Sequence, residues 1–364
     1  MSFATSNRSL IDHVHTNGTA ARKGVAFHRA LLQAGASTLW LMLMVLCVNT
    51  LLPAQPKIMI KEYPVGLPFA ITAGPDGAMW FTNYRSIGRI SMSGSVTFYP
   101  LPDQSKDARR ITAGPDGALW FTEGYPDAIG RITTSGTITE YPLPDPDSEA
   151  WGITAGPDGA LWFTSWSGGK IGRMTTGGIV TEYPLPRYAT VDSITTGPDG
   201  ALWFTESNEA GGGGYVGRIT TSGTITEYLL PAPFPGWAEW GFSGIVAGPD
   251  GALWITEYVG HRILRLTTSG SVTEYDLAGC SMTQLCGGGI TAGPDGALWF
   301  TLFAANSLGR ITTSGVVTQY PIPTGNSQSS AIATGPDGAI WFTEHAGGKI
   351  GRAIFVQPCA MCRP

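Results

Sequence analysis

One pentapeptide, Gly-Pro-Asp-Gly-Ala, occurs seven times in this sequence and constrains the fold more than any other feature. An internal repeat of this length predicts an architecture of seven equivalent units. Proline at the second position and glycine at the fourth favour a type I turn, so we expect the pentapeptide to join two strands. The copies are 40 to 51 residues apart and begin at Gly74, Gly114, Gly156, Gly197, Gly248, Gly293 and Gly335.

Each repeat predicts four short strands. In the second repeat these are 111–113, 119–122, 129–133 and 137–141, where aromatic and β-branched residues are frequent. A Pro-Asp-Gly turn follows the first strand, a variable loop the second, and a Thr-Ser-Gly turn the third. Four antiparallel strands per repeat describe a propeller blade, and we predict an all-β, seven-bladed β-propeller.

The two ends of the repeat array predict how the ring closes. The last repeat stops after 352–355 and lacks a fourth strand, whereas 60–64, ahead of the first repeat, matches the missing strand. We therefore expect the N-terminal strand to complete the seventh blade, so that no sheet edge is left open. The chain then divides into an N-terminal segment, 1–56, a propeller, 57–356, and a C-terminal tail, 357–364.

Composition and charge limit the partners. The chain of 364 residues contains 50 glycines and 26 prolines, and only 13% of it is charged, which suits short strands and tight turns. The N-terminal 56 residues hold four basic residues and one acidic residue, so the remainder has 18 basic and 26 acidic residues, a net charge of −8. An acidic body repels phosphate backbones, so we expect no nucleic-acid partner. We expect a monomer.

The N-terminal segment carries a targeting pattern. No charged residue occurs in 30–56, and 39–48 is a continuous apolar stretch preceded by basic residues. This pattern is typical of a signal peptide or membrane anchor, and its cleavage is left open. A buried core helix is the alternative. We expect an extracytoplasmic protein that contacts a membrane only through 30–56.

The cysteines agree with an oxidising compartment. Cys280 and Cys286 form one close pair, and Cys359 and Cys362 form another. We expect each pair to form a local disulfide. A zinc site that joins both pairs and a Cys-x-x-Cys redox motif are the alternatives.

The predicted strand order gives the disc two different faces. The Pro-Asp-Gly and Thr-Ser-Gly turns lie on one face and scarcely vary, whereas every variable loop lies on the opposite, variable face. Varied loops on a constant scaffold serve recognition, so we expect a site for a small-molecule, glycan or protein ligand there. Packing between blades is the alternative role of its aromatic residues. The candidates for ligand binding are Trp151, Trp237, Trp240, Tyr258 and Arg109. Further aromatic and polar residues of this face are Tyr84, Arg85, Arg110, Tyr125, Trp166, Tyr188, Asp192, Glu239 and Phe303.

Four repeats carry a glutamate directly after the second strand. These carboxylates would converge on a cation, or each would pair with the arginine of the following strand, and we expect the ion pairs. The glutamates are Glu123, Glu206, Glu257 and Glu344, and the arginines of their repeats are Arg131, Arg218, Arg265 and Arg352.

Histidine offers few acid–base candidates. Only His261 and His345 lie in the propeller, each in a loop between a second and a third strand. We expect solvated loop residues, with general acid–base catalysis as the alternative.

The full repeat resembles that of the virginiamycin B lyase (streptogramin lyase) family. The resemblance covers 58–355 and rests on two segments of the repeat, Ile-Thr-Ala-Gly-Pro-Asp-Gly-Ala-Leu-Trp-Phe-Thr-Glu and Ile-Gly-Arg-Ile-Thr-Thr-Ser-Gly-Thr-Ile-Thr-Glu-Tyr-Pro-Leu-Pro. The resemblance implies a propeller whose active members open the ester-linked ring of streptogramin B antibiotics by magnesium-dependent elimination. It also implies a site at the mouth of the central channel, with a histidine base and carboxylate-bound metal.

The family's site residues are incomplete in this chain. The Pro-His pair expected before the first strand of blade six falls on Gly287 and Gly288. The Glu-Pro-His pattern before blade seven falls on Gln328, Ser329 and Ser330, which replaces a metal carboxylate with an amide. The remaining family glutamate aligns at or beside Glu344 and His345. Glycine cannot remove a proton, so we expect a ligand-binding propeller that requires no cofactor.

The alternative is an enzyme. It would be a carbon–oxygen lyase with a rearranged site around Glu344, His345 and His261, and it would use Mg²⁺.

Overall fold

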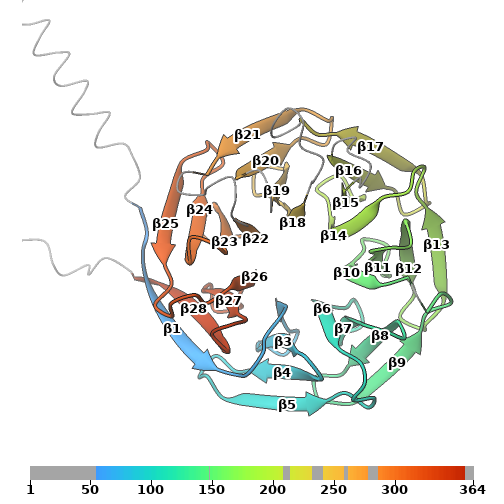
Figure 1. The fold of residues 1–364 in the computed structure, drawn as a ribbon, viewed down its shortest axis with the longest axis horizontal. Helices are drawn as coiled ribbons and strands as arrows, with labels where there is room; N and C mark the ends of the chain where they lie inside the picture. The colour runs from blue at the N-terminus through green and yellow to red at the C-terminus, as the bar shows by residue number, and fades with distance from the viewer. Residues whose placement is uncertain are drawn as a thin grey trace, which may run out of the picture. The chain divides into compact units, whose positions relative to one another are not determined.

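The computed structural model describes residues 55–146, 148–207, 214–231, 241–257, 261–277 and 286–356. These residues form seven four-stranded antiparallel sheets arranged around a central channel (Figure 1). The predicted all-β, seven-bladed propeller is therefore confirmed. Among the described residues, no helix has the length and apolar character needed to cross a membrane.

The blades follow one another along the chain. Blade 1 contains β2 (Ile71–Ala73), β3 (Met79–Asn83), β4 (Ser86–Ile90) and β5 (Val96–Pro100); blade 2 contains β6 (Ala108–Ala113), β7 (Leu119–Glu123), β8 (Ala128–Ile132) and β9 (Ile138–Pro142); blade 3 contains β10 (Ala150–Ala155), β11 (Leu161–Ser165), β12 (Lys170–Met174) and β13 (Val180–Pro184); blade 4 contains β14 (Thr190–Thr196), β15 (Leu202–Ser207), β16 (Gly214–Ile219) and β17 (Ile225–Leu229). Blade 5 contains β18 (Phe242–Ala247), β19 (Leu253–Glu257), β20 (Arg262–Leu266) and β21 (Val272–Asp276); blade 6 contains β22 (Gly287–Ala292), β23 (Leu298–Leu302), β24 (Ser307–Ile311) and β25 (Val317–Pro321); blade 7 contains β26 (Ser329–Thr334), β27 (Ile340–Glu344), β28 (Lys349–Val356) and β1 (Lys57–Pro64).

The seventh blade joins the two ends of the described chain. Strand β1 pairs antiparallel with β28, from Lys57 opposite Val356 to Pro64 opposite Lys349. The Tyr63 ring stacks on the Trp341 ring at 5.9 Å, and Lys349 Nζ lies 2.7 Å from a carboxylate oxygen of Glu62. The predicted closure of the ring by the N-terminal strand is confirmed.

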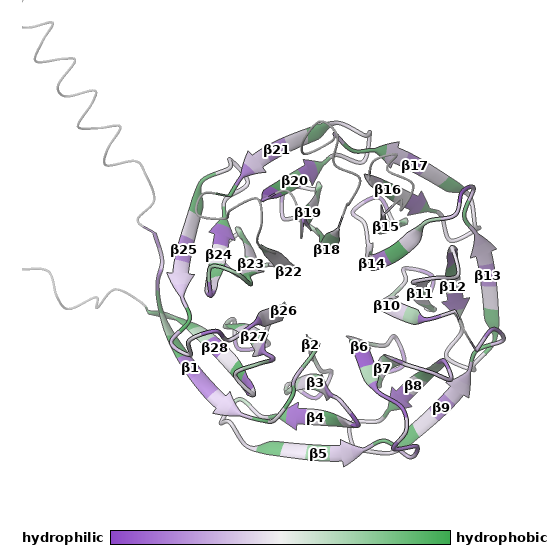
Figure 2. Cartoon of the chain, viewed as in Figure 1, coloured by the Kyte–Doolittle hydropathy of each residue, from purple (hydrophilic) through white to green (hydrophobic). Residues whose placement is uncertain are grey.

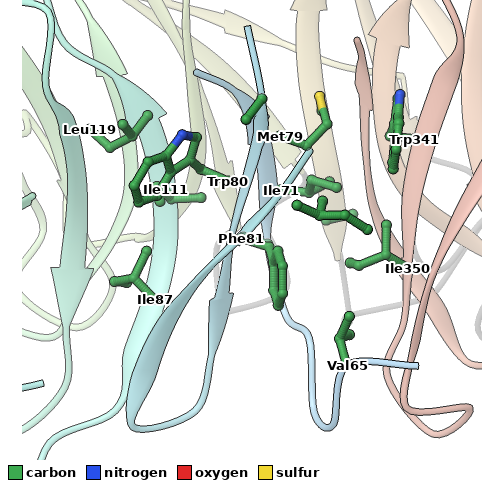
Figure 3. Packing of buried hydrophobic residues seen from close by; sticks show 14 of the residues in the cluster. Val65, Ile71, Met79, Trp80, Phe81, Ile87, Ile111, Leu119, Trp341 and Ile350 are labelled. Atoms are coloured by element: carbon green, nitrogen blue, oxygen red, sulfur yellow. The ribbon is translucent and has the colours of Figure 1, made fainter. Parts of the chain in front are cut away.

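Each second strand fills the space between neighbouring blades with alternate side chains. In Figure 3, Trp80 of β3 points towards Leu119 of the next blade, whereas Met79 lies on the side of Trp341 in the seventh blade. The equivalent tryptophans of all seven blades are fully buried. Alternation of this kind is what a strand buried on both faces requires.

The aspartate of each Pro-Asp-Gly turn ties the blade together. In blade 2, Asp116 accepts hydrogen bonds from Trp120 Nε1 at 2.9 Å and from Arg131 Nε at 2.7 Å. Partial burial raises the pKa of Asp116, but the bonds from Trp120 and Arg131 outweigh it, so this pKa is below its usual value. The same ion pair occurs in every blade, with Arg89, Arg131, Arg173, Arg218, Arg265, Arg310 and Arg352 as the arginines.

The predicted pairing of these arginines with the glutamates that follow the second strands is therefore wrong; these four residues, Glu123, Glu206, Glu257 and Glu344, are called here the rim glutamates. Each arginine faces the turn at the opposite end of the second strand from the glutamate, where the aspartate is the nearest carboxylate. Because the aspartate occurs in all seven repeats, the arginine persists in the three that lack the glutamate.

Candidate functional site

The seven inner strands line the central channel, and six of them contain a register shift near the same place. In β6, the regular pairing is interrupted between Ala108 and Ile111, and in β22 between Gly287 and Ile290. Such bulges turn side chains out of the regular alternation and are frequent beside functional sites. They occur just before an isoleucine that every repeat contains.

The residues that line the channel can be described by their distance in sequence before this isoleucine. The isoleucines and the residues directly before them surround a narrow space of about 160 Å³. The residues two positions before the isoleucine form what we call the upper ring, which lies nearer the variable face. The isoleucines are Ile71, Ile111, Ile153, Ile194, Ile245, Ile290 and Ile332. The upper ring consists of Phe69, Arg109, Trp151, Asp192, Ser243, Gly288 and Ser330.

A cavity of about 400 Å³ lies at this level and is called here the channel-mouth pocket. One wall is aromatic, and another consists of small residues from blades 6 and 7. Hydrophilic segments of β6 and β14 stand beside the channel in Figure 2, and these strands supply the two charged residues of the pocket. The aromatic lining residues are Phe69, Trp151, Trp166, Phe242 and Phe303. The remaining lining residues are Arg110, Asp192, Gly241, Ser243, Gly287, Gly288, Gly289, Ser329 and Ser330.

The aromatic wall is a contiguous set of rings. The Trp151 and Trp166 ring centroids lie 5.4 Å apart with the planes at 54°, and Phe69 meets Trp151 edge-on at 5.8 Å. Trp166 is 38% exposed, so part of its indole remains open to a ligand. Such a wall suits a ligand with a flat apolar body.

Arg110 and Asp192 are the two charged residues of the pocket. Burial raises the pKa of Asp192 to about 6, and the Arg110 charge and the Trp151 indole oppose this rise. Burial lowers the pKa of Arg110, and Asp192 opposes this change. The two groups therefore stabilise each other's charged form in a poorly hydrated site.

The rim glutamates do not converge. Each is buried within its own blade, with 0 to 1% of the side chain exposed, and three have a cation from the variable-face loops or the third strand. Glu123 lies 3.2 Å from Lys106 Nζ, and Glu257 lies 2.7 Å from an Arg262 nitrogen. Burial, followed by the Glu140 charge, raises the pKa of Glu123 to about 7, and the Lys106 charge opposes this rise.

Glu344 differs from the other rim glutamates in its surroundings. Unlike them, it has no ion pair among the described residues; its two carboxylate oxygens also have no hydrogen-bond partner there, as is true of Glu206. Burial, followed by the Glu62 charge, raises its pKa to about 7, against the effect of Lys349. It does not line the channel-mouth pocket.

The two candidate histidines are far from equivalent. His345 Nδ1 lies 3.2 Å from the Pro68 carbonyl oxygen, and its ring meets Phe69 edge-on at 6.3 Å. It therefore supports the aromatic wall from behind. His261 is only 8% exposed, so the expectation of a solvated residue is wrong there; burial lowers its pKa. Its ring nitrogens have no hydrogen-bond partner among the described residues.

The positions to which the resemblance assigns a base and a metal ligand present no suitable donor. A Cβ on Gly288 would lie 2.1 Å from Thr301 Oγ1, so the Thr301 side chain occupies the space that a larger residue would need. Gln328 does not line the pocket, and among the described residues that do, Asp192 is the only carboxylate. No cluster of three His, Cys, Asp or Glu residues that would hold a metal occurs among the described residues. These side chains do not fit a magnesium site.

Several predicted residues can be placed, and others cannot. Trp151 lines the pocket, whereas Arg109 does not, although its guanidinium carbon lies 5.3 Å from the Trp151 ring centroid. Tyr125 and Tyr188 are 74% and 66% exposed and do not line the pocket. Outside the described residues lie Trp237, Glu239, Trp240, Tyr258, Cys280, Cys359, Cys362 and the segment 1–54. Cys286 is buried and disulfide-bonded, and its pairing with Cys280 stays a prediction.

Sequence reasoning missed Phe69, Gly241, Phe242, Ser243 and Gly289 and did not group the pocket residues. The available signal was position within the repeat, because Phe69 precedes Ile71 by two residues, as Trp151 precedes Ile153. Aligning the seven repeats on that isoleucine would have assembled the upper ring.

A seven-bladed β-propeller with an aromatic pocket at one mouth of its channel is the class of protein that this fold and site define. More specifically, the chain belongs to the Virginiamycin B lyase family, whose model matches residues 58–238 and 189–357.

Solved structures of this family are similar over nearly the whole propeller. Virginiamycin B lyase from Staphylococcus aureus is 38% identical, with a TM-score of 0.74, over 82% of this chain and 100% of that one. A catalytically inactive histidine-to-alanine variant of that enzyme with quinupristin matches with the same values. Virginiamycin B lyase from Bordetella parapertussis is 40% identical over 52 residues, which span 13% of this chain and only 17% of that protein.

A more distant likeness concerns the fold alone. The extracellular domain of a putative hybrid two component system from B. thetaiotaomicron is 15% identical, with a TM-score of 0.64, over 85% of this chain and 44% of that one.

Proposed function

We propose that this chain is a non-catalytic ligand-binding propeller that acts outside the cytoplasm and holds a small organic molecule in the channel-mouth pocket. One observation carries the proposal. The pocket combines an aromatic wall with Gly288 and Ser330 at the positions where the resemblance expects histidines, so it offers contact area without a base.

The size of the pocket favours a small ligand over a glycan chain or a protein. A cavity of about 400 Å³ is in the range of drug-sized ligand sites. Phe69, Trp151 and Trp166 supply ring faces and edges, and Arg110 with Asp192 supplies polar groups that orient the ligand. The proposed activity requires no cofactor. The apolar stretch 39–48 and the paired cysteines support a place outside the cytoplasm.

Membership of the family supports a second candidate, a magnesium-dependent lyase acting on streptogramin B or a related ester. In that case His345, next to Phe69 of the pocket wall, would be the first residue to test as a base. The incomplete set of metal donors argues against this candidate.

Binding and turnover can be separated with the purified full-length chain. We expect compounds from a panel of aromatic amphipathic molecules, cyclic depsipeptides and glycans to raise the melting temperature. Trp151→Ala should abolish the shift. Tyr125→Ala removes another aromatic ring of the variable face that is 74% exposed and outside the pocket, and it should retain the shift.

Two results would contradict the proposal. One is the absence of any shift across the panel. The other is magnesium-dependent ring opening of a streptogramin B compound, which would favour the lyase, and His345→Ala would then test the base.

A further inference from the structure

We propose that Arg110 and Asp192 together recognise the edge of a neutral ring amide, a lactam, while the aromatic wall contacts the rest of the ring. This inference rests on the proposed function and names the ligand class of the same pocket. It depends on Asp192 Oδ1 and Trp151 Nε1, which have no hydrogen-bond partner among the described residues, and on the Arg110 guanidinium, which two rings hold in place.

Arg110 supplies oriented donors. Its guanidinium carbon lies 5.1 Å from the Phe69 ring centroid and 5.3 Å from that of Trp151, so two rings fix the position of the group. The side chain makes no hydrogen bond within the described part of the protein, although the backbone N–H bonds to Thr122 Oγ1. A guanidinium fixed in this way offers its N–H groups to a ligand at a small entropic cost.

Asp192 supplies the matching acceptor. Its Oδ1 atom is buried and has no hydrogen-bond partner among the described residues, and the same is true of Trp151 Nε1. Buried polar groups of this kind cost free energy unless a ligand or water satisfies them. The pocket therefore contains one carboxylate acceptor and two donors, and all three belong to residues that line it.

The charges of the pair select against ionised ligands. Asp192 repels a carboxylate, and Arg110 repels an ammonium group. A lactam has no net charge, and its cis geometry places C=O and N–H on one edge. Its carbonyl oxygen can accept from Arg110 while its N–H donates to Asp192, so both protein groups are satisfied at once.

Four flat probes of similar size separate these possibilities. They are isoquinolin-1(2H)-one, its N-methyl derivative, 1-naphthoate and 1-naphthylmethylamine, measured by titration calorimetry on the full-length chain at pH 8. We expect the lactam to bind and the N-methyl lactam to bind roughly tenfold more weakly, because it lacks the donor to Asp192. The anion and the cation should bind more weakly than the lactam.

Charge-changing variants give a readout that a purely structural role would not produce. Asp192→Ala should weaken lactam binding about tenfold and strengthen 1-naphthoate binding, because Arg110 is then unopposed. Arg110→Met should weaken lactam binding by a similar factor and favour the amine. Arg109→Met is the matched control, since Arg109 also contacts the Trp151 ring at 5.3 Å but does not line the pocket.

Equal affinities for the lactam and its N-methyl derivative would overturn the inference, and this comparison needs no variant to fold. Unchanged preferences in both charge-changing variants would overturn it as well. If the naphthyl probes bind and the lactam does not, the inference fails while the proposed binding function stands. If no compound of either panel binds, the proposed function fails too.

Discussion

Removal of the closing strand should destabilise the protein far more than removal of the residues before it. We compare a chain that lacks 1–63 with one that lacks only 1–56, which keeps β1. In the longer truncation, β28 loses its partner at seven of eight register positions, since only Pro64 remains, and Trp341 loses the stacked Tyr63 ring. Loss of a large buried aromatic ring alone costs about 3–5 kcal/mol.

Other contacts of the strand add to this cost. Ile58 and Ile60 pack on the core of blades 6 and 7, and partial loss of their burial adds about 1 kcal/mol each. The total is on the order of 5 kcal/mol or more, comparable to the whole stability of many domains. We therefore expect the longer truncation to be unfolded or to melt at least 10 °C lower, since 1 kcal/mol shifts the melting temperature of a large domain by about 2–4 °C.

Thermal melting by circular dichroism and urea unfolding provide the measurements. A synthetic peptide of residues 57–64 should restore part of the stability of the longer truncation, because it can pair with β28. If the two truncated chains melt alike, the ring does not depend on β1, and the argument from the pairing in blade 7 is refuted.

Three further predictions concern the family site, the cysteines and a rim glutamate. The unmodified chain should not linearise a streptogramin B compound measurably, and Gly288→His should lower the melting temperature, because its Cβ would lie 2.1 Å from Thr301 Oγ1; activity without added mutations, or an unchanged melting temperature, would contradict this. Non-reducing digestion and mass spectrometry of exported material should yield a peptide crosslinked through Cys280 and Cys286, and free thiols at both positions would count against it. The folded-state pKa of Glu123 is about 7, above its usual 4.5, so the stability it contributes is complete below pH 4.5 and is lost as the pH rises through 7. Between pH 5 and pH 8, the free energy of unfolding measured in urea should therefore fall by roughly 2 kcal/mol less in Glu123→Gln than in the unmodified protein. An equal fall in the two proteins would disprove the assignment.

The sequence alone determined the architecture. Seven copies of one pentapeptide, each followed by a strand with a tryptophan at its second position, allow only an array of equivalent units, and the strand 60–64 supplies the one that the last unit lacks. This inference succeeds because turn geometry and strand alternation are local properties, which are repeated seven times. It also identified the face that varies, and Trp151 on it.

The partners of charged groups were decided by the tertiary structure. Arg131 has a glutamate, Glu123, and a turn aspartate, Asp116, within its own repeat, and both satisfy a charge argument. Only the register of β7 on β8 shows that Arg131 lies opposite Trp120, close to the turn, while Glu123 lies at the far end beside Lys106. Sequence spacing does not contain this distinction.

The pocket, too, exists only in the closed ring. Four different blades supply Phe69, Arg110, Trp151 and Asp192, and the first and last of these residues are 123 positions apart in the sequence. Arg110, Trp151 and Asp192 lie on inner strands at the level of the register shift, and Phe69 lies just before β2; ring closure brings these levels together around one axis. The sequence thus determined which positions are equivalent, and the tertiary structure determined which of their side chains meet, because contact across a channel depends on the closure of all seven blades.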